Sequence, residues 1–177
     1  MFAALLSSLM LSTVAEAAPA PEIKLRDLSN QERTLSAEQG KVVLINFWAT
    51  WCAPCMVEMP HIQQMYTDLA DIDGDGTQEF EVLSISIDDA RDRSKIKPLV
   101  KSKGLTFPVL WDQSKSVSQV YNPSGVVPMT LIIDQSGEIA MTVQEYAPGE
   151  ECQLRAKVIE LLGVEDPAMP EQCVTTP

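Results

Sequence analysis

The stretch NFWATWCAPCMVEMP, residues 46–60, decides the fold, because it joins the end of an apolar run to two cysteines that are three positions apart. Cys52 and Cys55 at this spacing suit three kinds of site: a metal site, a structural disulfide or a redox-active pair. The spacing alone does not choose among them. The choice depends on the residues on either side of the pair and on the rest of the chain.

The two flanks of the pair predict a strand that runs directly into a helix. Residues 41–48 (KVVLINFW) are almost all apolar, as expected for a strand covered on both faces. From Pro54 onward apolar residues recur every three or four positions, which predicts a helix. The stripe consists of Met59, Ile62, Met65 and Leu69. Cys52 is therefore expected at the helix N-terminus, and Cys55 one turn further along the same face.

This arrangement favours redox chemistry. Free backbone N–H groups and the helix dipole stabilise negative charge at a helix N-terminus, so the pKa of the Cys52 thiol is expected below the free value of about 8.5. Cys52 can then attack a disulfide, and Cys55 can resolve the mixed disulfide by expelling the substrate thiol. Pro54 suits the first turn, where no backbone donor is needed. Trp51 is expected to shield the reactive sulfur or to contact a partner.

Metal binding is a weaker interpretation of the pair. Zinc would need two further ligands, and the remaining candidates, His61, Cys152 and Cys173, do not have the spacing of a second ligand pair. The acidic segment DIDGDG, residues 71–76, resembles the first half of an EF-hand loop. However, Val82 occupies the position of the bidentate glutamate, so we expect no metal there.

The composition limits the classes of partner. A chain of 177 residues with 45% hydrophobic residues is sufficient for one domain with a substantial core. The formal net charge is −12, whereas nucleic-acid binding depends on Lys and Arg that neutralise phosphates. We therefore expect no nucleic-acid partner, and docking on anionic lipid headgroups is disfavoured for the same reason.

The N-terminal segment predicts export. The apolar run of residues 2–14 is followed by AEA, residues 15–17, which resembles the cleavage site of a secretory signal. The run is short for a bilayer span, which needs about 20 apolar residues. No Lys or Arg precedes it, so an uncleaved anchor or a start further upstream stays open. We expect residues 1–17 to be a signal peptide and the protein to be periplasmic or extracytoplasmic, membrane-anchored if the segment is not cleaved.

The remaining elements alternate between strands and helices. The sequence predicts, in order, a hairpin over 22–36, strands over 80–88 and 107–112, helices over 90–104 and 114–121, a second hairpin over 128–146 and a helix over 150–163. This order predicts an α/β domain with a mixed sheet between helical layers. The domain is expected over residues 18–177, with its core at about 22–165 and a loose C-terminal tail.

The motif NFWATWCAPC resembles the active-site segment of thioredoxin-fold oxidoreductases, and WCAPCMVEMP is similar to that of the exported TlpA and ResA group, which is DsbE-like. The resemblance covers about residues 22–162. Pro60 matches the helix-kinking proline of this fold, which would be costly in a helix without such a role. The N-terminal hairpin and residues 88–112 resemble the extension and the inserted helix and strand of the group. The resemblance implies a thioredoxin-like mixed sheet flanked by helices.

A second segment, SGVVPMTLIID, resembles the strand that faces the cysteines in this fold. The resemblance implies a cis bond before Pro128 and a substrate segment pairing with the backbone at Val127. The alternative is an ordinary trans proline that opens a strand. Glu58 matches a glutamate of the TlpA and ResA pattern and is expected to exchange a proton with Cys55, unless it is a solvated helix residue. Asn46 stands where many thioredoxins have a buried aspartate.

The function implied by the resemblance is an exported thiol:disulfide oxidoreductase without a bound cofactor. It would act on protein disulfides or dithiols, reducing them in cytochrome c maturation with electrons from a membrane thiol donor. One alternative is a thiol peroxidase, but this would need Thr three residues before the reactive Cys52, where the chain has Ala49. The other is a non-catalytic metallochaperone or binding module. The residues between the cysteines do not decide between reductant and oxidant.

Two further cysteines, Cys152 and Cys173, lie outside the segments that resemble the catalytic region. We expect a disulfide that ties the tail to the last helix, which for a loop of this size would contribute about 3 kcal/mol. Free or intermolecular thiols are the alternative.

Overall fold

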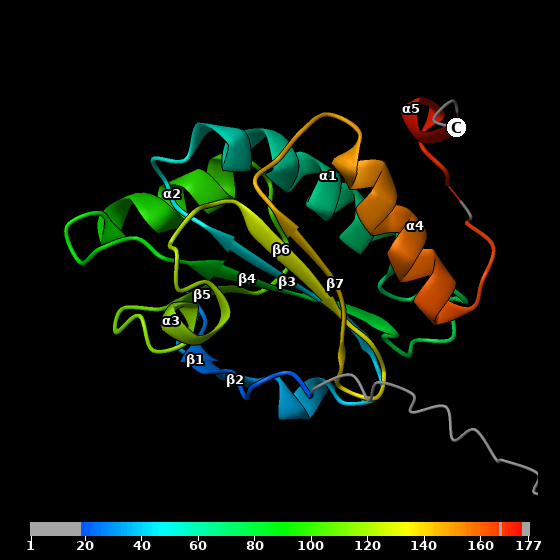
Figure 1. The fold of residues 1–177 in the computed structure, drawn as a ribbon, viewed down its shortest axis with the longest axis horizontal. Coiled ribbons are helices and arrows are strands. Elements are labelled where there is room, and N and C mark those ends of the chain that lie inside the picture. The colour runs from blue at the N-terminus through cyan, green and yellow to red at the C-terminus, as the bar shows by residue number, and fades with distance from the viewer. Residues whose placement is uncertain (1–18, 167, 175–177) are drawn as a thin grey trace, which may run out of the picture.

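The apolar run before the cysteines forms strand β3 (Val42–Trp48), and all seven of its residues are buried. The computed structural model describes residues 19–166 and 168–174, so the expected signal peptide lies outside the described residues. Strand β3 occupies the centre of a five-stranded sheet with the order β5-β4-β3-β6-β7 (Figure 1). Its central place explains the unbroken apolar run, because side chains on both of its faces are covered.

The sheet is mixed. Strand β3 pairs in parallel with β4 (Phe80–Ser86), which pairs in parallel with β5 (Val109–Trp111). On its other side, β3 pairs antiparallel with β6 (Met129–Ile133), which pairs antiparallel with β7 (Ile139–Gln144). The predicted α/β architecture with a mixed sheet is therefore confirmed.

Helices cover both faces of the sheet (Figure 1). The parallel strands are joined by α1 (Ala53–Leu69) and α2 (Arg93–Ser102), which lie on the same face as α4 (Glu150–Leu162). The opposite face carries the short helix α3 (Ser118–Tyr121), whose Tyr121 ring lies 5.8 Å from the Phe47 ring of β3. The predicted helical layers are thus confirmed, and the C-terminal ends of β3, β4 and β5 meet at one edge of the sheet.

The N-terminal hairpin forms as expected. Strands β1 (Lys24–Arg26) and β2 (Glu32–Thr34) make a separate two-stranded antiparallel sheet. A bridge between Asp27 and Leu110 attaches this hairpin to β5. Two short helices, η1 (Ser36–Glu38) and α5 (Glu171–Val174), were not predicted.

Two helices are shorter than predicted, for local reasons. Helix α2 begins at Arg93 rather than at Ala90, because Asp92 N–H closes a turn onto Asp89 O at 2.9 Å. Helix α3 begins at Ser118 rather than at Ser114, because Lys115 has a φ of +61°, which an α-helix does not allow. Both helices retain their predicted place in the chain.

Helix α1 turns its predicted apolar stripe into the core. Its buried residues are Cys55, Glu58, Met59, Ile62, Met65 and Leu69, so the stripe also contains one cysteine and one carboxylate. Pro60 lies inside the helix, as expected from the resemblance. Within residues 19–166 and 168–174, no helix has the length and apolar character that a bilayer span requires.

Candidate active site

The cysteine pair lies where the strand-to-helix junction was predicted. Cys52 is the N-cap of α1, and its Sγ accepts a hydrogen bond from Cys55 N–H at 3.2 Å. The two cysteines are joined by a disulfide, so the structure holds the oxidised pair. Cys52 is 4% exposed and Cys55 is fully buried. The backbone N–H at this sulfur is the kind of donor that would stabilise a Cys52 thiolate after reduction.

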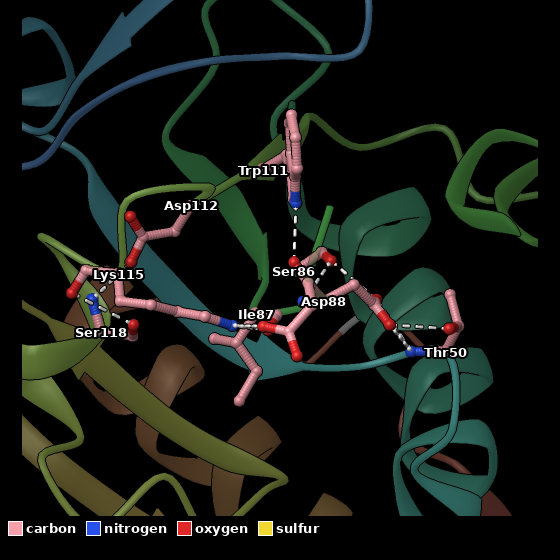
Figure 2. A network of polar contacts seen from close by, with 9 residues as sticks. Thr50, Ser86, Ile87, Asp88, Trp111, Asp112, Lys115 and Ser118 are labelled. Atoms are coloured by element: carbon pink, nitrogen blue, oxygen red, sulfur yellow. Dashed lines mark hydrogen bonds and ion pairs between the residues drawn. The ribbon is translucent and has the colours of Figure 1, made fainter. Parts of the chain in front are cut away.

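The segment before Cys52 is a tight turn held by a distant residue. Cys52 N–H donates to Ala49 O at 3.0 Å and closes the turn. Thr50, within the turn, donates its N–H and its hydroxyl to the carboxylate of Asp88, which follows β4 (Figure 2). The side chain of Trp51 is 63% exposed beside the disulfide. The backbone of the turn is therefore held by Asp88, and the turn exposes the Trp51 side chain to solvent.

A buried polar cluster lies one helical turn beyond Cys55. Glu58 is 1% exposed and accepts hydrogen bonds from Thr130 Oγ1 at 2.8 Å and from Asn46 Nδ2 at 2.9 Å. The same Asn46 amide donates to Thr130 Oγ1 at 3.0 Å. Asn46 and Thr130 are directly opposite each other in the β3–β6 register, which brings both side chains to the same face as α1.

Burial decides the electrostatics of this cluster. Burial raises the pKa of Glu58 from 4.5 to about 7, against the hydrogen bonds from Thr130 and Asn46, which favour the charged form. The nearby charge of Glu150 adds to the rise in pKa. Glu58 therefore changes its protonation state near neutral pH, which is the property required of a group that exchanges protons with thiols at that pH.

The segment that leads into β6 lies near the C-terminal end of β3. The Val127–Pro128 peptide bond is cis, and Met129, the next residue, pairs with Phe47 near the end of β3. Val127 is half-buried and Val126 is 39% exposed. The strand pairing thus brings the predicted substrate-binding segment to the C-terminal end of β3. This strand ends at Trp48, four residues before Cys52.

The other two cysteines form a disulfide of their own, between Cys152 of α4 and Cys173 of α5. Arg155 of α4 adds two ion pairs, to Asp68 at 2.8 Å and to Asp166 at 2.6 Å. Together these contacts attach the C-terminal segment to α1 and α4.

No hydrogen bond of the described residues joins His61 or the acidic segment 71–76 to Cys52 or Cys55, whereas His61 and Cys173 line one small pocket. His61 stacks on Tyr146, with ring centres 6.3 Å apart. Asp71, Asp73 and Glu79 place one oxygen each within 4.8 Å of one another and are the one described group that could hold a metal ion. Exposed acidic groups of this kind are common without an ion, and the two aspartates are exposed.

Two residues of the site were missed in the sequence. Thr130 gives no signal of its own, because a threonine in a strand is ordinary; only the register with Asn46 brings it to Glu58. Asp88 ends an apolar strand and was taken as part of it. A charged residue at the end of a mostly apolar segment is the signal that could have marked it.

Comparisons with known proteins agree with this geometry. A model of the AhpC/TSA family matches residues 17–142. The thiol-disulfide oxidoreductase ResA of Geobacillus kaustophilus is 33% identical over 132 residues, which are 75% of this chain and 71% of that protein. The thioredoxin-like protein YneN of Bacillus subtilis is 34% identical over 127 residues, 71% of this chain and 69% of YneN.

Solved structures show the same fold. A thioredoxin-like protein of Porphyromonas gingivalis superposes with a TM-score of 0.66 at 30% identity, over 81% of this chain and 91% of that one. A thiol:disulfide interchange protein of Chlorobium tepidum superposes with a TM-score of 0.70, over 85% of this chain and all of that one. Its identity of 23% supports the fold alone.

Proposed function

This chain belongs to the AhpC/TSA family and is a thiol-disulfide oxidoreductase, and we propose that it works as a reductant of disulfides in other proteins. The observation that carries the direction is Glu58, buried one turn beyond Cys55, with a pKa of about 7. A carboxylate beside two thiols opposes their ionisation. Strong oxidants owe their potential to a stabilised reduced form, and a charged Glu58 would offset part of the stabilisation that the Cys55 N–H and the N-terminus of α1 give to the Cys52 thiolate.

The first step uses Cys52. Its thiolate attacks one sulfur of the substrate disulfide, a new S–S bond joins Cys52 to the substrate, and the second substrate sulfur leaves as a thiolate that takes a proton. The Cys55 N–H at Cys52 Sγ and the N-terminus of α1 stabilise the attacking charge.

The second step uses Cys55 and Glu58. The Cys55 thiol transfers its proton to the Glu58 carboxylate and attacks Cys52 Sγ, which expels the remaining substrate sulfur as a thiolate. The substrate gains two electrons and becomes a dithiol, and Cys52 and Cys55 lose two electrons and form the disulfide. Glu58 suits this role because a pKa of about 7 lets it accept and release the proton near neutral pH.

We assign substrate binding to Val127, Pro128 and Trp51. The backbone at Val127, before cis-Pro128, would pair with an extended substrate segment next to Cys52, as one added strand. Trp51, with 63% of its surface exposed, would contact the same segment. Trp51 precedes Cys52 in the chain and is exposed, and Val127 is half-buried next to the cis-proline.

We further propose that the protein acts outside the cytoplasm. The support is the apolar N-terminal sequence with its AEA motif. In that compartment the disulfide of each turnover needs a source of electrons, and we assign this to a membrane thiol donor. Reduction of cytochrome c precursors before haem attachment is the proposed physiological use.

The reduction potential tests the direction, and two variants and a peroxide assay test the active-site roles and the rival functions. Equilibration with glutathione at pH 7 should place the Cys52/Cys55 couple near the thioredoxin value of about −270 mV, whereas a value near −120 mV, as in the strongest oxidants, would reverse the proposal. A Cys55→Ser variant, which cannot resolve the mixed disulfide, should accumulate covalent complexes with substrate proteins. Full activity in Cys52→Ser would instead support a binding module, and rapid peroxide turnover by the wild type a peroxidase.

A further inference from the structure

Another buried carboxylate, Asp88, contacts the turn that precedes Cys52 (Figure 2). Asp88 lies two residues beyond the end of β4 and is fully buried. Its carboxylate accepts the Thr50 hydroxyl at 2.7 Å and the Thr50 N–H at 2.9 and 3.1 Å. Ser86 Oγ donates to the same carboxylate at 2.8 Å. Three donors therefore surround one carboxylate, and two of them come from the turn that leads to Cys52.

The choice of an aspartate here is costly for stability. All three donors are uncharged, and within residues 19–166 and 168–174 no Lys or Arg forms an ion pair with Asp88. Burying a carboxylate without a cation is unfavourable compared with an apolar side chain of similar volume. A buried carboxylate whose hydrogen bonds go to the turn that leads to Cys52 indicates a role in the site rather than in the core.

The backbone of Asp88 is itself anchored on two strands. Trp111 of β5 donates its Nε1–H to Asp88 O at 2.8 Å, and Asp88 N–H donates to Ser86 Oγ at 3.1 Å (Figure 2). The preceding residue, Ile87, donates its N–H to Trp48 O of β3 at 2.8 Å and accepts a hydrogen bond from Lys115 Nζ. Residues 87 and 88 are therefore held by hydrogen bonds to β3, β4 and β5 at the C-terminal ends of these strands. The Asp88 carboxylate is a fixed acceptor for the turn.

We propose that Asp88 is the positioning residue of Cys52. Thr50 lies inside the turn that Cys52 N–H closes onto Ala49 O, so fixing Thr50 fixes the backbone that enters α1. The position of Cys52 Sγ at the Cys55 N–H, 3.2 Å away, depends on that backbone. Loss of the carboxylate would let the turn move and take the sulfur away from the donor that stabilises its charge. The inference rests on the proposed role of Cys52 as the attacking group.

The test is the pH dependence of Cys52 alkylation in the reduced protein, measured with iodoacetamide between pH 5 and 9. Asp88→Ala removes every acceptor from Thr50, and we expect the apparent pKa of Cys52 to rise and its alkylation rate at pH 7 to fall about tenfold. Asp88→Asn keeps one acceptor oxygen for Thr50 and removes the charge. We expect it to recover most of the rate.

A matched variant covers the case in which Asp88→Ala does not fold. Thr50→Val keeps the shape of the side chain and the N–H contact but removes the hydroxyl, so a two- to threefold lower alkylation rate is expected. The proposal is overturned if Asp88→Ala folds and alkylates like the wild type, or if Asp88→Asn and Asp88→Ala give the same profile. Equal profiles would mean that the charge of Asp88, rather than its hydrogen bonds to Thr50, controls the alkylation of Cys52.

These outcomes are independent of the proposed reductase activity, because alkylation of Cys52 needs no protein substrate. A wild type that fails to reduce peptide disulfides, while Asp88 still controls the alkylation profile, would contradict the proposed function alone. A wild type that reduces them, with a Cys52 profile unaffected in Asp88→Ala, would contradict the positioning role alone.

Discussion

The two disulfides of this protein are the same bond in different settings. Cys52 and Cys55 are 3 positions apart and begin α1, whereas Cys152 and Cys173 are 21 positions apart and join α4 to α5. A bond stabilises a fold mainly by restricting the unfolded chain, and the restriction grows with the loop that it closes. By this argument the second disulfide stabilises the fold more than the first does.

The charged groups near the two bonds differ in the same sense. Near Cys152, the buried Arg155 is neutralised by Asp68 and Asp166, which lowers the pKa of Asp166 and keeps that pair ionised. Near Cys55, buried Glu58 has hydrogen-bond donors but no ion pair within the described part of the chain, and its pKa rises to about 7. The groups around a disulfide, rather than the bond itself, therefore indicate whether the disulfide stabilises the fold or exchanges electrons.

The largest effect that the comparison predicts is on activity. Cys52→Ser removes the attacking sulfur, so we expect the rate of peptide-disulfide reduction to fall at least about thousandfold. The double variant Cys152→Ser/Cys173→Ser serves as the control and should stay within about twofold of the wild type at 25 °C. Equal losses in both variants would remove the distinction between the two bonds.

The next effect is on stability and runs in the opposite order. The loop-closure relation predicts that Cys152→Ser/Cys173→Ser lowers the free energy of unfolding by about 3 kcal/mol, against about 2 kcal/mol for Cys52→Ser/Cys55→Ser. Urea unfolding of the oxidised wild type and both double variants measures the difference. A greater loss of unfolding free energy in the Cys52/Cys55 variant would contradict the expectation that the Cys152–Cys173 disulfide stabilises the fold more.

The third effect concerns the pH dependence of stability that Glu58 causes. Because the folded pKa of Glu58, about 7, lies above its ordinary value of 4.5, its contribution to stability is fully present below pH 4.5 and is lost as the pH rises to about 7. Glu58→Gln should remove up to about 3 kcal/mol of this pH dependence.

Urea unfolding of oxidised wild type and Glu58→Gln at several pH values between 4 and 8 measures this difference. The control is Glu150→Gln, which removes the neighbouring charge and should lower the pKa of Glu58 only slightly, since that charge is the smallest of its causes. Parallel pH curves for wild type and Glu58→Gln would show that Glu58 titrates normally and is not the proton-exchanging group.

The smallest effect concerns the exposed side chain of Trp51. Trp51 is 63% exposed, so Trp51→Ala should change the free energy of unfolding by less than about 0.5 kcal/mol. If Trp51 contacts the substrate, KM for a peptide disulfide should rise several-fold, with a smaller change in kcat. Steady-state kinetics together with urea unfolding separates the two quantities. An unchanged KM would restrict the substrate contact to Val127 and Pro128.

Local patterns in the sequence were sufficient for the elements that position the cysteines. The run of residues 41–48 and the stripe from Met59 to Leu69 correctly predicted β3, α1 and the junction at Cys52, because burial on two faces and burial on one helical face leave different periods. The alternation of strands and helices predicted the mixed sheet. The ends of α2 and α3 were wrong, because a turn and a positive φ compete with helix there and have no clear periodic signal.

The sequence by itself determined which residues could exchange electrons and where along the chain they begin a helix. Only the tertiary structure decided what surrounds them. Thr130 lies 72 positions from Glu58, and Asp88 lies 38 positions from Thr50. Such contacts depend on strand register and on which helix covers which face, and these follow from the packing of the whole sheet rather than from any local period. For the same reason, burial is the main cause that raises the pKa of Glu58 from the 4.5 of an ordinary carboxylate to about 7.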